Sequence, residues 1–472
     1  MSINISTSGN ILVQQKFSLF TEKDWELKKQ NYSNNTSLFF SGKKNEFFVI
    51  TNSNSIEFLI GLGSNPQDFE IQQVANKFSS TYRKNIQSIS TYVDNSLNKN
   101  QLENFVKGLF LGTYSYPFKK DHPIWKSDFN LIIDNISNDE ANDISIKSKA
   151  IVEGQTAAME WLNKPANFKK VDHISAFLKD ISAQYQFKYT AFNREQAAEL
   201  GLGAFLAVNQ GSAMDCAFTI IEYRPNYNAE LKNVGLVGKC ILFDTGGISL
   251  KQSTNLHYMK SDMGGATAVI GTLIAAAELN LPVNITAILP ITDNTISELA
   301  YLPSDVITAY NGKTIEVLDT DAEGRLILAD GLSYLSKNYK TDVLIDLATL
   351  TGSSVRMFGD TCGALFSNDE TLKNSLIKSG DQTNQRLWNL PLWDVWKDDF
   401  KSDVADLKNI SLKPVGDCII AAKFLEQFIE NHPKWAHLDI AGVAFGNTNY
   451  AKEKAATGYG VQLLVDFIKN FA

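Results

Sequence analysis

One short acidic stretch, DTDAEGRL at residues 319–326, gathers several side chains that can perform chemistry: Asp319, Asp321, Glu323 and Arg325. Residues 313–318 (KTIEVL) predict a strand before it, and the pattern from Leu326 onward predicts a helix after it. The carboxylates would then follow the carboxyl end of a strand, where open α/β sheets place their sites. Asp321 and Glu323 would face one way if strand geometry continues through them. The competing interpretation is a solvated turn whose acids favour a helix N-terminus.

A second stretch, earlier in the chain, adds two carboxylates and two cations. Residues 234–243 predict an apolar strand that contains Lys239, and a lysine in such a strand is costly to bury as a cation. Asp244 ends this strand and precedes a Gly-Gly turn, which allows close approach of the backbone to another group. Lys251 follows, and Asp262 precedes a predicted alanine-rich helix. The two stretches together therefore offer an acidic cluster with cations among it.

Four carboxylates from these stretches are candidates for metal binding: Asp244, Asp262, Asp321 and Glu323. Hard oxygen ligands suit Mg²⁺, Mn²⁺ or Zn²⁺, and four carboxylates neutralise two divalent ions. Two ions that share carboxylates would lie roughly 3.5 Å apart, the spacing of dinuclear hydrolases. Lys239 can join only as the neutral amine, because two dications and an apolar strand both lower its pKa. Without metal, the simpler interpretation is a strand-end lysine whose ammonium reaches water.

These motifs resemble those of the leucyl aminopeptidase family, the cytosolic dinuclear metallo-aminopeptidases. FDTGGISLK, SDMGGA and TDAEGRL stand in family order, followed by DLATLTG, LPLW, KSDVADLKN and WAHLDIAGVAF, with WLNKPAN and AVNQGS upstream. The resemblance covers residues 150–472 and implies metal-dependent release of the N-terminal residue, preferably apolar and leucine-like, from peptides. It implies five metal ligands, of which Asp244 and Glu323 bridge both ions: Lys239, Asp244, Asp262, Asp321 and Glu323.

The resemblance also implies roles for residues around the metals. Lys251 would stabilise the oxyanion of the tetrahedral intermediate. Arg325 does not deprotonate, so it would hold a bicarbonate that acts as the base. Asp262 and one metal would bind the free amine of the substrate. Backbone groups near Leu350 and Gly352 would help to hold the bicarbonate, and the pocket for the first side chain is implied near Met259, Thr349 and Ala456.

The family implies two divalent ions per chain, Mn²⁺ or Zn²⁺ first, with Mg²⁺ or Co²⁺ as alternatives, and assembly into a homohexamer. The family also implies peptide substrates. A net charge of −8 and a pI near 5.3 argue against nucleic acid as a partner. The sequence contains no apolar run long enough to span a membrane and no visible signal peptide. The four cysteines are scattered, which predicts free thiols and a cytoplasmic location.

A chain of 472 residues predicts two domains. We expect a smaller N-terminal α/β domain over residues 1–147, resembling macro domains, and a catalytic domain over residues 148–472. Residues 148–165 would form a linking helix. In the catalytic part, strand and helix patterns alternate, which predicts an α/β fold with a mostly parallel sheet flanked by helices.

Three features leave alternatives open. Asp319 stands where the family usually has asparagine. Either its charge favours cationic substrates, or its side chain hydrogen-bonds local backbone amides as asparagine would, with no effect on substrate choice. Cys240 stands where glycine is usual. His257 lies between Lys251 and Asp262, and it is interpreted as a residue of the pocket rim rather than a ligand. A non-catalytic binding role and a nucleotide-like ligand in the N-terminal domain are the competing functions.

Overall fold

The structure is a computed structural model in which two compact units can be described separately. It describes residues 3–7, 15–86, 90–94, 97–115, 129–226, 230–413 and 415–472. One unit comprises Met1–Thr156 with Thr448–Lys452, and the other comprises Ala157–Asn447 with Glu453–Ala472. Both units combine sheets with packed helices, which confirms the α/β fold with two parts. The boundary between the units falls within one helix, α5 (Asn138–Asn163).

The first unit is built on a six-stranded sheet in the order β1-β6-β5-β2-β4-β3. Every pairing is parallel except that of β3 with β4. Phe17, Phe58 and Phe78 pack edge to face in its core. The strands are β1 (Ile3–Ser6), β2 (Gln15–Thr21), β3 (Phe47–Thr51), β4 (Ile56–Gly63), β5 (Thr91–Asp94) and β6 (Phe129–Ile133), and the helices before α5 are α1 (Glu22–Lys28), α2 (Asn34–Phe39), α3 (Asp68–Thr81) and α4 (Lys99–Gly112).

The second unit is built on a nine-stranded sheet in the order β16-β15-β18-β14-β9-β11-β8-β7, with β10 also paired to β11. Its central strands are parallel, and β7, β8 and the β15–β16 pair run antiparallel to their inner neighbours. The strands are β7 (Lys188–Phe192), β8 (Ala217–Tyr223), β9 (Lys232–Gly238), β10 (Cys240–Asp244), β11 (Val283–Asn294), β14 (Val343–Ala348), β15 (Gly363–Ser367), β16 (Leu387–Asn389) and β18 (Trp435–Asp439).

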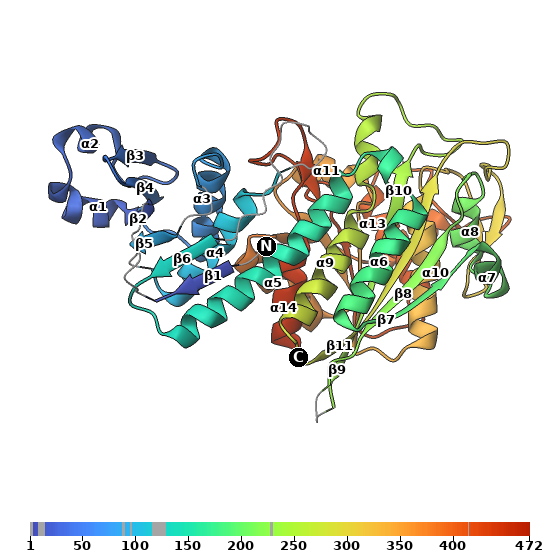
Figure 1. Cartoon of the computed structure of the whole chain (residues 1–472). Coiled ribbons are helices and arrows are strands. Elements are labelled where there is room, and N and C mark those ends of the chain that lie inside the picture. The colour runs from blue at the N-terminus through green and yellow to red at the C-terminus, as the bar shows by residue number, and fades with distance from the viewer. Residues whose placement is uncertain are drawn as a thin grey trace. The chain divides into compact units, whose positions relative to one another are not determined.

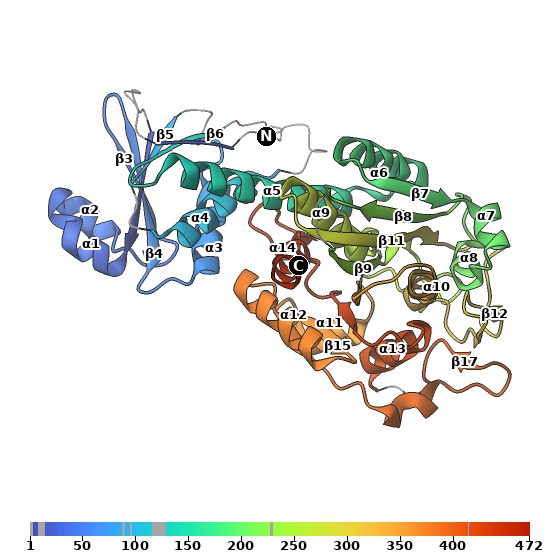
Figure 2. The ribbon, with the colours of Figure 1, turned by 90° about the horizontal axis from the view of Figure 1, so that it is seen from below.

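Helices cover both faces of this sheet (Figures 1 and 2). The helices α6, α9, α12 and α14 pack on one face, and α8, α10 and α13 pack on the other. Their bounds are α6 (Val171–Tyr185), α8 (Gly203–Asn209), α9 (Gly264–Glu278), α10 (Glu323–Asn338), α12 (Glu370–Thr383), α13 (Asp417–Leu425) and α14 (Val461–Phe471). The short helices α7 (Arg194–Glu199) and α11 (Gly352–Phe358) complete the layers.

The strand expected over residues 234–243 is in fact two strands. β9 ends at Gly238 and β10 begins at Cys240, so Lys239 lies in the break between them. The reason is the close approach of α9, because a Cβ on Gly238 would lie 2.6 Å from the Ala266 Cα. The Lys239 backbone carbonyl accepts a hydrogen bond from the Ala266 N–H (3.0 Å), and its N–H donates to the Leu347 carbonyl (3.0 Å). The Lys239 N–H thus still binds β14, whereas its carbonyl turns to α9 instead of to a neighbouring strand.

The expected strand over residues 313–318 is also placed differently. Only Thr314–Glu316 form a strand, β13, and it belongs to a separate three-stranded sheet rather than to the central one. β13 pairs antiparallel with β12 (Val306–Thr308) and parallel with β17 (Leu407–Lys408). A hairpin to β12 satisfies the ladder of β13, so this strand does not enter the central sheet. The acidic stretch therefore does not follow a strand of the central sheet.

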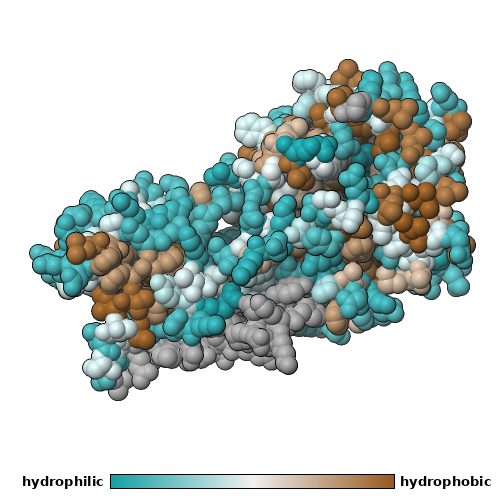
Figure 3. All heavy atoms as spheres, turned by 90° about the horizontal axis from the view of Figure 1, so that it is seen from above, coloured by the Kyte–Doolittle hydropathy of each residue, from teal (hydrophilic) through white to brown (hydrophobic). Residues whose placement is uncertain are grey.

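The surface drawn in Figure 3 is mainly hydrophilic, with separate hydrophobic areas. This mixture is ordinary for a globular protein, whose surface always retains apolar atoms. Among the described residues, no helix is long and apolar enough to cross a membrane.

A buried carboxylate, Asp330 in α10, joins three segments of the second unit. Its Oδ2 accepts the Phe205 N–H (2.9 Å) in the first turn of α8, and its Oδ1 accepts the Tyr310 N–H (2.7 Å) after β12. Both donors are backbone groups that would be costly to leave unpaired in the interior. Asp330 therefore holds α8 and the β12–β13 hairpin against α10, the helix that begins with Glu323.

We expect Asp330→Asn to lower the free energy of unfolding by about 1–3 kcal/mol, because the amide keeps one acceptor and turns an NH₂ group toward the second N–H. Urea denaturation followed by circular dichroism measures this loss. Asp342→Asn is the matched control: Asp342 accepts the Asn233 N–H at 2.7 Å, but at the exposed surface, so its loss should stay below about 1 kcal/mol. Equal losses in the two variants would contradict the assigned role.

Candidate metal centre

Four polar residues lie where neighbouring strands of the central sheet end. Lys239 follows β9, Asp244 ends β10, Asn294 ends β11 and Thr349 follows β14. These strands are parallel to one another, so their carboxyl ends share one edge of the sheet. The carboxyl edge is the usual position of a binding site in an open α/β sheet.

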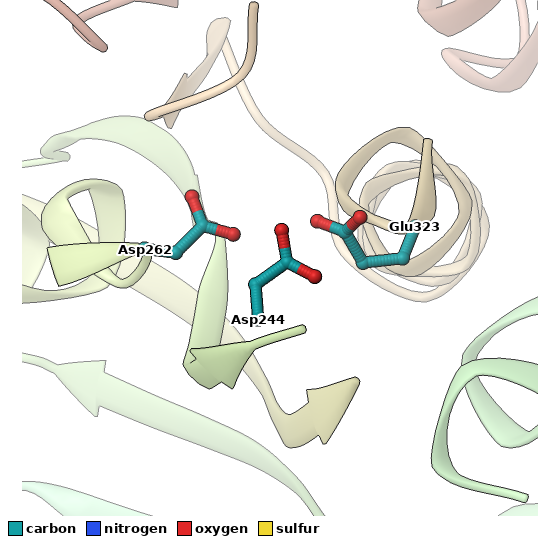
Figure 4. Close-up of side chains that lie close together, drawn as sticks. All are labelled: Asp244, Asp262 and Glu323. Carbon is teal, nitrogen blue, oxygen red and sulfur yellow. The ribbon is translucent and has the colours of Figure 1, made fainter. Parts of the chain in front are cut away.

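Three buried carboxylates meet at this edge. Asp244, Asp262 and Glu323 each offer one oxygen, and these oxygens lie within 4.8 Å of one another. Figure 4 shows the three side chains pointing toward a common centre from three different elements. Asp262 follows the 3₁₀ helix Leu256–Ser261, and Glu323 is the first residue of α10. The sequence suggested that strand geometry continues from Asp321 through Glu323. This is wrong, because α10 begins at Glu323 and not at Leu326.

Two lysine ammonium groups lie among the carboxylates. Lys239 Nζ lies 2.6 Å from Asp262 Oδ2 and 2.9 Å from Glu323 Oε1, and it also donates to the Thr349 carbonyl (2.9 Å). Lys251 Nζ lies 2.8 Å from Asp244 Oδ2 and also pairs with Asp321 Oδ1. Each lysine thus holds two of the four predicted acidic ligands. The predicted set of Lys239, Asp244, Asp262, Asp321 and Glu323 is gathered in one place.

The crowding of charge changes the acidity of these groups. Burial lowers the pKa of Lys239, but the nearby charges of Asp262, Glu323 and Asp244 outweigh burial and leave that pKa above its ordinary value. The pKa of Lys251 is raised in the same way by Asp244, Glu323 and Asp321 against burial. Burial, reinforced by the Asp244 charge, raises the pKa of Asp321 to about 7. Lys239 is therefore a cation as long as no positive charge other than the lysines lies among the carboxylates. The neutral amine expected from the sequence requires added positive charge, such as that of metal ions.

Asn294 is a site residue that the sequence reasoning missed. Its Nδ2 donates to Asp244 Oδ1 (2.9 Å) and to the Thr320 carbonyl (2.9 Å), and it lies 3.5 Å from Glu323 Oε2. Thr320 in turn donates from Oγ1 to the Gly246 carbonyl (2.6 Å) and receives the Ser249 N–H (2.8 Å). These contacts join the turn after β10 to the acidic stretch before α10. The polar residues that follow Ile291, namely Thr292, Asp293 and Asn294, were the available signal for a site residue at this strand end.

The side chain of Asp319 forms a hydrogen bond with the nearby backbone. Its Oδ1 accepts the Asp321 N–H at 2.8 Å, and its carbonyl accepts a hydrogen bond from Asn409 Nδ2 (2.6 Å). An asparagine oxygen can accept the same N–H, since both residue types form such turns. Of the two interpretations of Asp319, the geometry favours the local hydrogen bond.

The predicted pocket residues lie on three segments near the carboxylates. Thr349 Oγ1 donates to Asp262 Oδ1 (2.8 Å), so Thr349 orients a carboxylate of the cluster. Met259 lies in the 3₁₀ helix that precedes Asp262, and Ala456 lies in β20 (Ala455–Ala456). Asn163 connects these last two segments, because its Oδ1 accepts the Ala456 N–H (3.0 Å) and its carbonyl accepts Lys260 Nζ (3.0 Å). His257 is exposed and contacts Tyr258, with ring centroids 4.0 Å apart.

The predicted anion-binding groups already have partners within the protein. Arg325, in the first turn of α10, is buried and donates from Nη1 to the Asn409 carbonyl (2.9 Å) and from Nη2 to Asp417 Oδ1 (3.2 Å). The Leu350 N–H donates to Asp439 Oδ1 (3.3 Å). Gly352, the other predicted backbone contact, is the first residue of α11. Neither Asp417 nor Asp439 was identified from the sequence.

The donor set fits divalent cations. Buried carboxylates that converge within a few ångströms repel one another unless positive charge lies between them. Here ammonium groups supply that charge, and hard divalent ions with oxygen ligands would supply more of it in the same place. The fold and the site together define an α/β protein with a candidate metal centre at the carboxyl edge of its sheet.

Comparisons with known proteins identify the family. The family model described as cytosol aminopeptidase family, catalytic domain, matches residues 156–465. A probable cytosol aminopeptidase of Chlorobium limicola is 41% identical over 379 residues, which cover 78% of this chain and 75% of that protein. A probable cytosol aminopeptidase of Rickettsia canadensis is 37% identical over 453 residues, covering 92% and 90%. The chain therefore belongs to the cytosol aminopeptidase family.

Solved structures agree with this family. The bottromycin maturation enzyme BotP in complex with Mn matches with a TM-score of 0.86 and 25% identity, covering 97% of this chain and 99% of that one. Membership of this family makes the chain a metal-dependent aminopeptidase, an enzyme that hydrolyses peptides at the N-terminus, which confirms the resemblance noted in its motifs.

We expect Asp319→Asn to leave peptide hydrolysis nearly unchanged, because the amide oxygen retains the Asp321 N–H bond. The ratio of kcat/KM for lysine-ended and leucine-ended dipeptides should stay within about twofold of wild type, with the acid limb of the pH profile in place. Asp319→Ala, which removes the acceptor, is the contrasting variant and should lower kcat/KM for all substrates alike. A selective loss of lysine-ended substrates in Asp319→Asn would instead assign a role to the charge.

Proposed function

We propose that this enzyme removes N-terminal residues, preferably apolar and leucine-like ones, from peptides at a centre of two divalent metal ions. The observation that carries the proposal is the convergence of buried Asp244, Asp262 and Glu323 on one point, with Asp321 and two lysines beside them. Four carboxylates supply the negative charge for two dications when Lys239 binds as the neutral amine. Family membership supports the reaction class.

Five residues would hold the ions: Lys239, Asp244, Asp262, Asp321 and Glu323. When bound, the ions supply Lewis acidity toward the scissile carbonyl and lower the pKa of a water molecule to make the nucleophile. Resemblance to the family supports Asp244 and Glu323 as the residues that would serve both ions, and Asn294 contacts both carboxylates. Thr349 fixes the orientation of Asp262, which is assigned to receive the free amine of the substrate. An amine partner at this position restricts cleavage to the first residue.

Lys251 is assigned to charge stabilisation. Its side chain is 22% exposed, so it borders the open side of the cluster, while Lys239 is enclosed. The acids around it raise its pKa against the effect of burial. A fixed cation at this position favours negative charge developing on the substrate carbonyl oxygen. The first side chain of the substrate is assigned to the surroundings of Met259, Thr349 and Ala456.

We also propose Mn²⁺ or Zn²⁺ as the ions, with Mg²⁺ or Co²⁺ as alternatives, because carboxylates and one amine suit all four. The Mn complex of BotP supports manganese. Resemblance to the family supports a homohexamer in the cytoplasm, and light scattering measures the assembly directly. Peptides are the expected substrates, and the net charge of −8 does not favour nucleic acid.

We expect Glu323→Gln to lose both metal and activity, because one residue is assigned to both ions. Metal content by plasma mass spectrometry should fall from about two ions per chain, and release of amine from Leu-p-nitroanilide should fall by at least about a hundredfold. Chelation should inactivate the wild type, and Mn²⁺, Zn²⁺ or Co²⁺ should restore it.

Glu316→Gln serves as the control, since Glu316 lies on β13 and accepts a hydrogen bond from Ser402. Its metal content should equal that of wild type. A wild type that turns over fully after its metal content has been brought to zero would reject the metal centre, and one ion per chain at full activity would reject the dinuclear form.

A further inference from the structure

The guanidinium of Arg325 already faces a carboxylate of the same chain. Asp417, the first residue of α13, lies with Oδ1 at 3.2 Å from Arg325 Nη2. The second terminal nitrogen, Nη1, donates to the Asn409 carbonyl. Arg325 is 4% exposed, whereas the Asp417 side chain is 45% exposed, so the ion pair lies at the border between the interior and water. The ion pair therefore occupies the position where the family resemblance places a free anion.

A free bicarbonate fits this arrangement poorly. Both terminal nitrogens of Arg325 have protein acceptors, and the Leu350 N–H is turned to Asp439. Nε is buried without a hydrogen-bond partner in the described part of the chain, but an anion there would lie beside the Asp417 carboxylate. Like charges at that separation repel each other, and water on the exposed side of Asp417 screens part of this repulsion. No step of the reaction is therefore assigned to bicarbonate.

Asp417 also contacts the segment that carries Thr349. Its Oδ2 lies 3.3 Å from Ser353 Oγ, and that Oγ accepts the Cys418 N–H (2.9 Å) and lies 3.1 Å from Thr351 Oγ1. Thr351 Oγ1 in turn donates to Asp439 (2.6 Å). The start of α13 is thereby tied to the loop after β14, whose first residue orients Asp262. Asp417 is thus connected to the carboxylate cluster on two sides, through Arg325 and through Ser353.

We propose that Asp417 is a resident anion, which replaces a free bicarbonate as the partner of Arg325 and makes catalysis by this chain independent of added bicarbonate. The proposal rests on the proposed function, since it assigns a positioning residue for the same reaction. Its basis is the Arg325–Asp417 contact together with the acceptors already bound by Asn409 and Leu350. Asp417 is a positioning residue because it acts through Arg325 and through Ser353 of α11.

The test uses the metal-loaded full chain in buffer freed of carbon dioxide, with and without sodium bicarbonate. Wild-type turnover of Leu-p-nitroanilide should change by less than about twofold on adding bicarbonate. Asp417→Asn should lose about tenfold in kcat without bicarbonate and recover at least half of that loss when bicarbonate is added, because the uncharged amide leaves Arg325 open to an anion. Asp398→Asn, which removes an exposed carboxylate paired with Lys401, is the charge-matched control and should show no bicarbonate dependence.

Binding provides a readout separate from turnover. Carbon-13 NMR of labelled bicarbonate should show broadening by Asp417→Asn at millimolar concentration and none by wild type, with Arg325→Gln in the Asp417→Asn background abolishing it. Any one of three results would overturn the proposal. They are bicarbonate binding by wild type that depends on Arg325, a wild-type rate that rises with bicarbonate, and an Asp417→Asn variant whose rate is unchanged or is not rescued. Asp417→Gly repeats the test should Asp417→Asn fold poorly. If wild type with Mn²⁺ or Zn²⁺ released no amine at all, the proposed function would fail instead, while the NMR result would still decide on Asp417.

Discussion

The structure of the second unit depends on neutralising the charge of carboxylates that are buried close together. Asp244, Asp262 and Glu323 are almost completely buried and converge within a few ångströms, an arrangement that like charges cannot keep unaided. Two ammonium groups, Lys239 and Lys251, each contact two carboxylates and reduce the repulsion. Removing one partner from a buried ion pair typically costs 3–5 kcal/mol, roughly half the stability of a domain. The acids and the lysines therefore depend on one another, and the same electrostatics that require ammonium groups also attract dications.

The composition of the site was readable from the sequence because its chemistry is carried by charged side chains in short motifs. All five predicted ligands meet in one place, and Thr349 lies against one of them. The strands β9, β11 and β14 were also predictable, since buried parallel strands appear as continuous apolar runs. Their parallel pairing then places the ends of the runs, and so Lys239, Asp244 and Thr349, at one edge.

What the sequence did not reveal depends on contacts between distant segments. The apolar run over residues 234–243 looks like one strand, and only the approach of α9 at Gly238 breaks it. The run over residues 313–318 has a strand pattern, yet pairing with β12 and β17 removes it from the central sheet. Asn294, Asn409 and Asp417 act through hydrogen bonds to residues between 26 and 92 positions away, which no local pattern encodes. A charged residue can be located from its own type, but its partner is set by the tertiary structure.

The break at Lys239 explains how one side chain can serve both the fold and the site. Its N–H binds the Leu347 carbonyl within β14 and its carbonyl binds the first turn of α9, so both elements fix its backbone. The side chain then extends along the start of α10, where a Cβ on Gly324 would lie 2.6–2.8 Å from its Cδ, Cε and Nζ atoms. Only glycine leaves room there, so α10 can bring Glu323 to the lysine at hydrogen-bonding distance. A lysine in a continuous strand would have its backbone committed to the sheet ladder on both sides. Because its carbonyl turns away from the ladder, the sheet edge, α9 and α10 all contact this one residue.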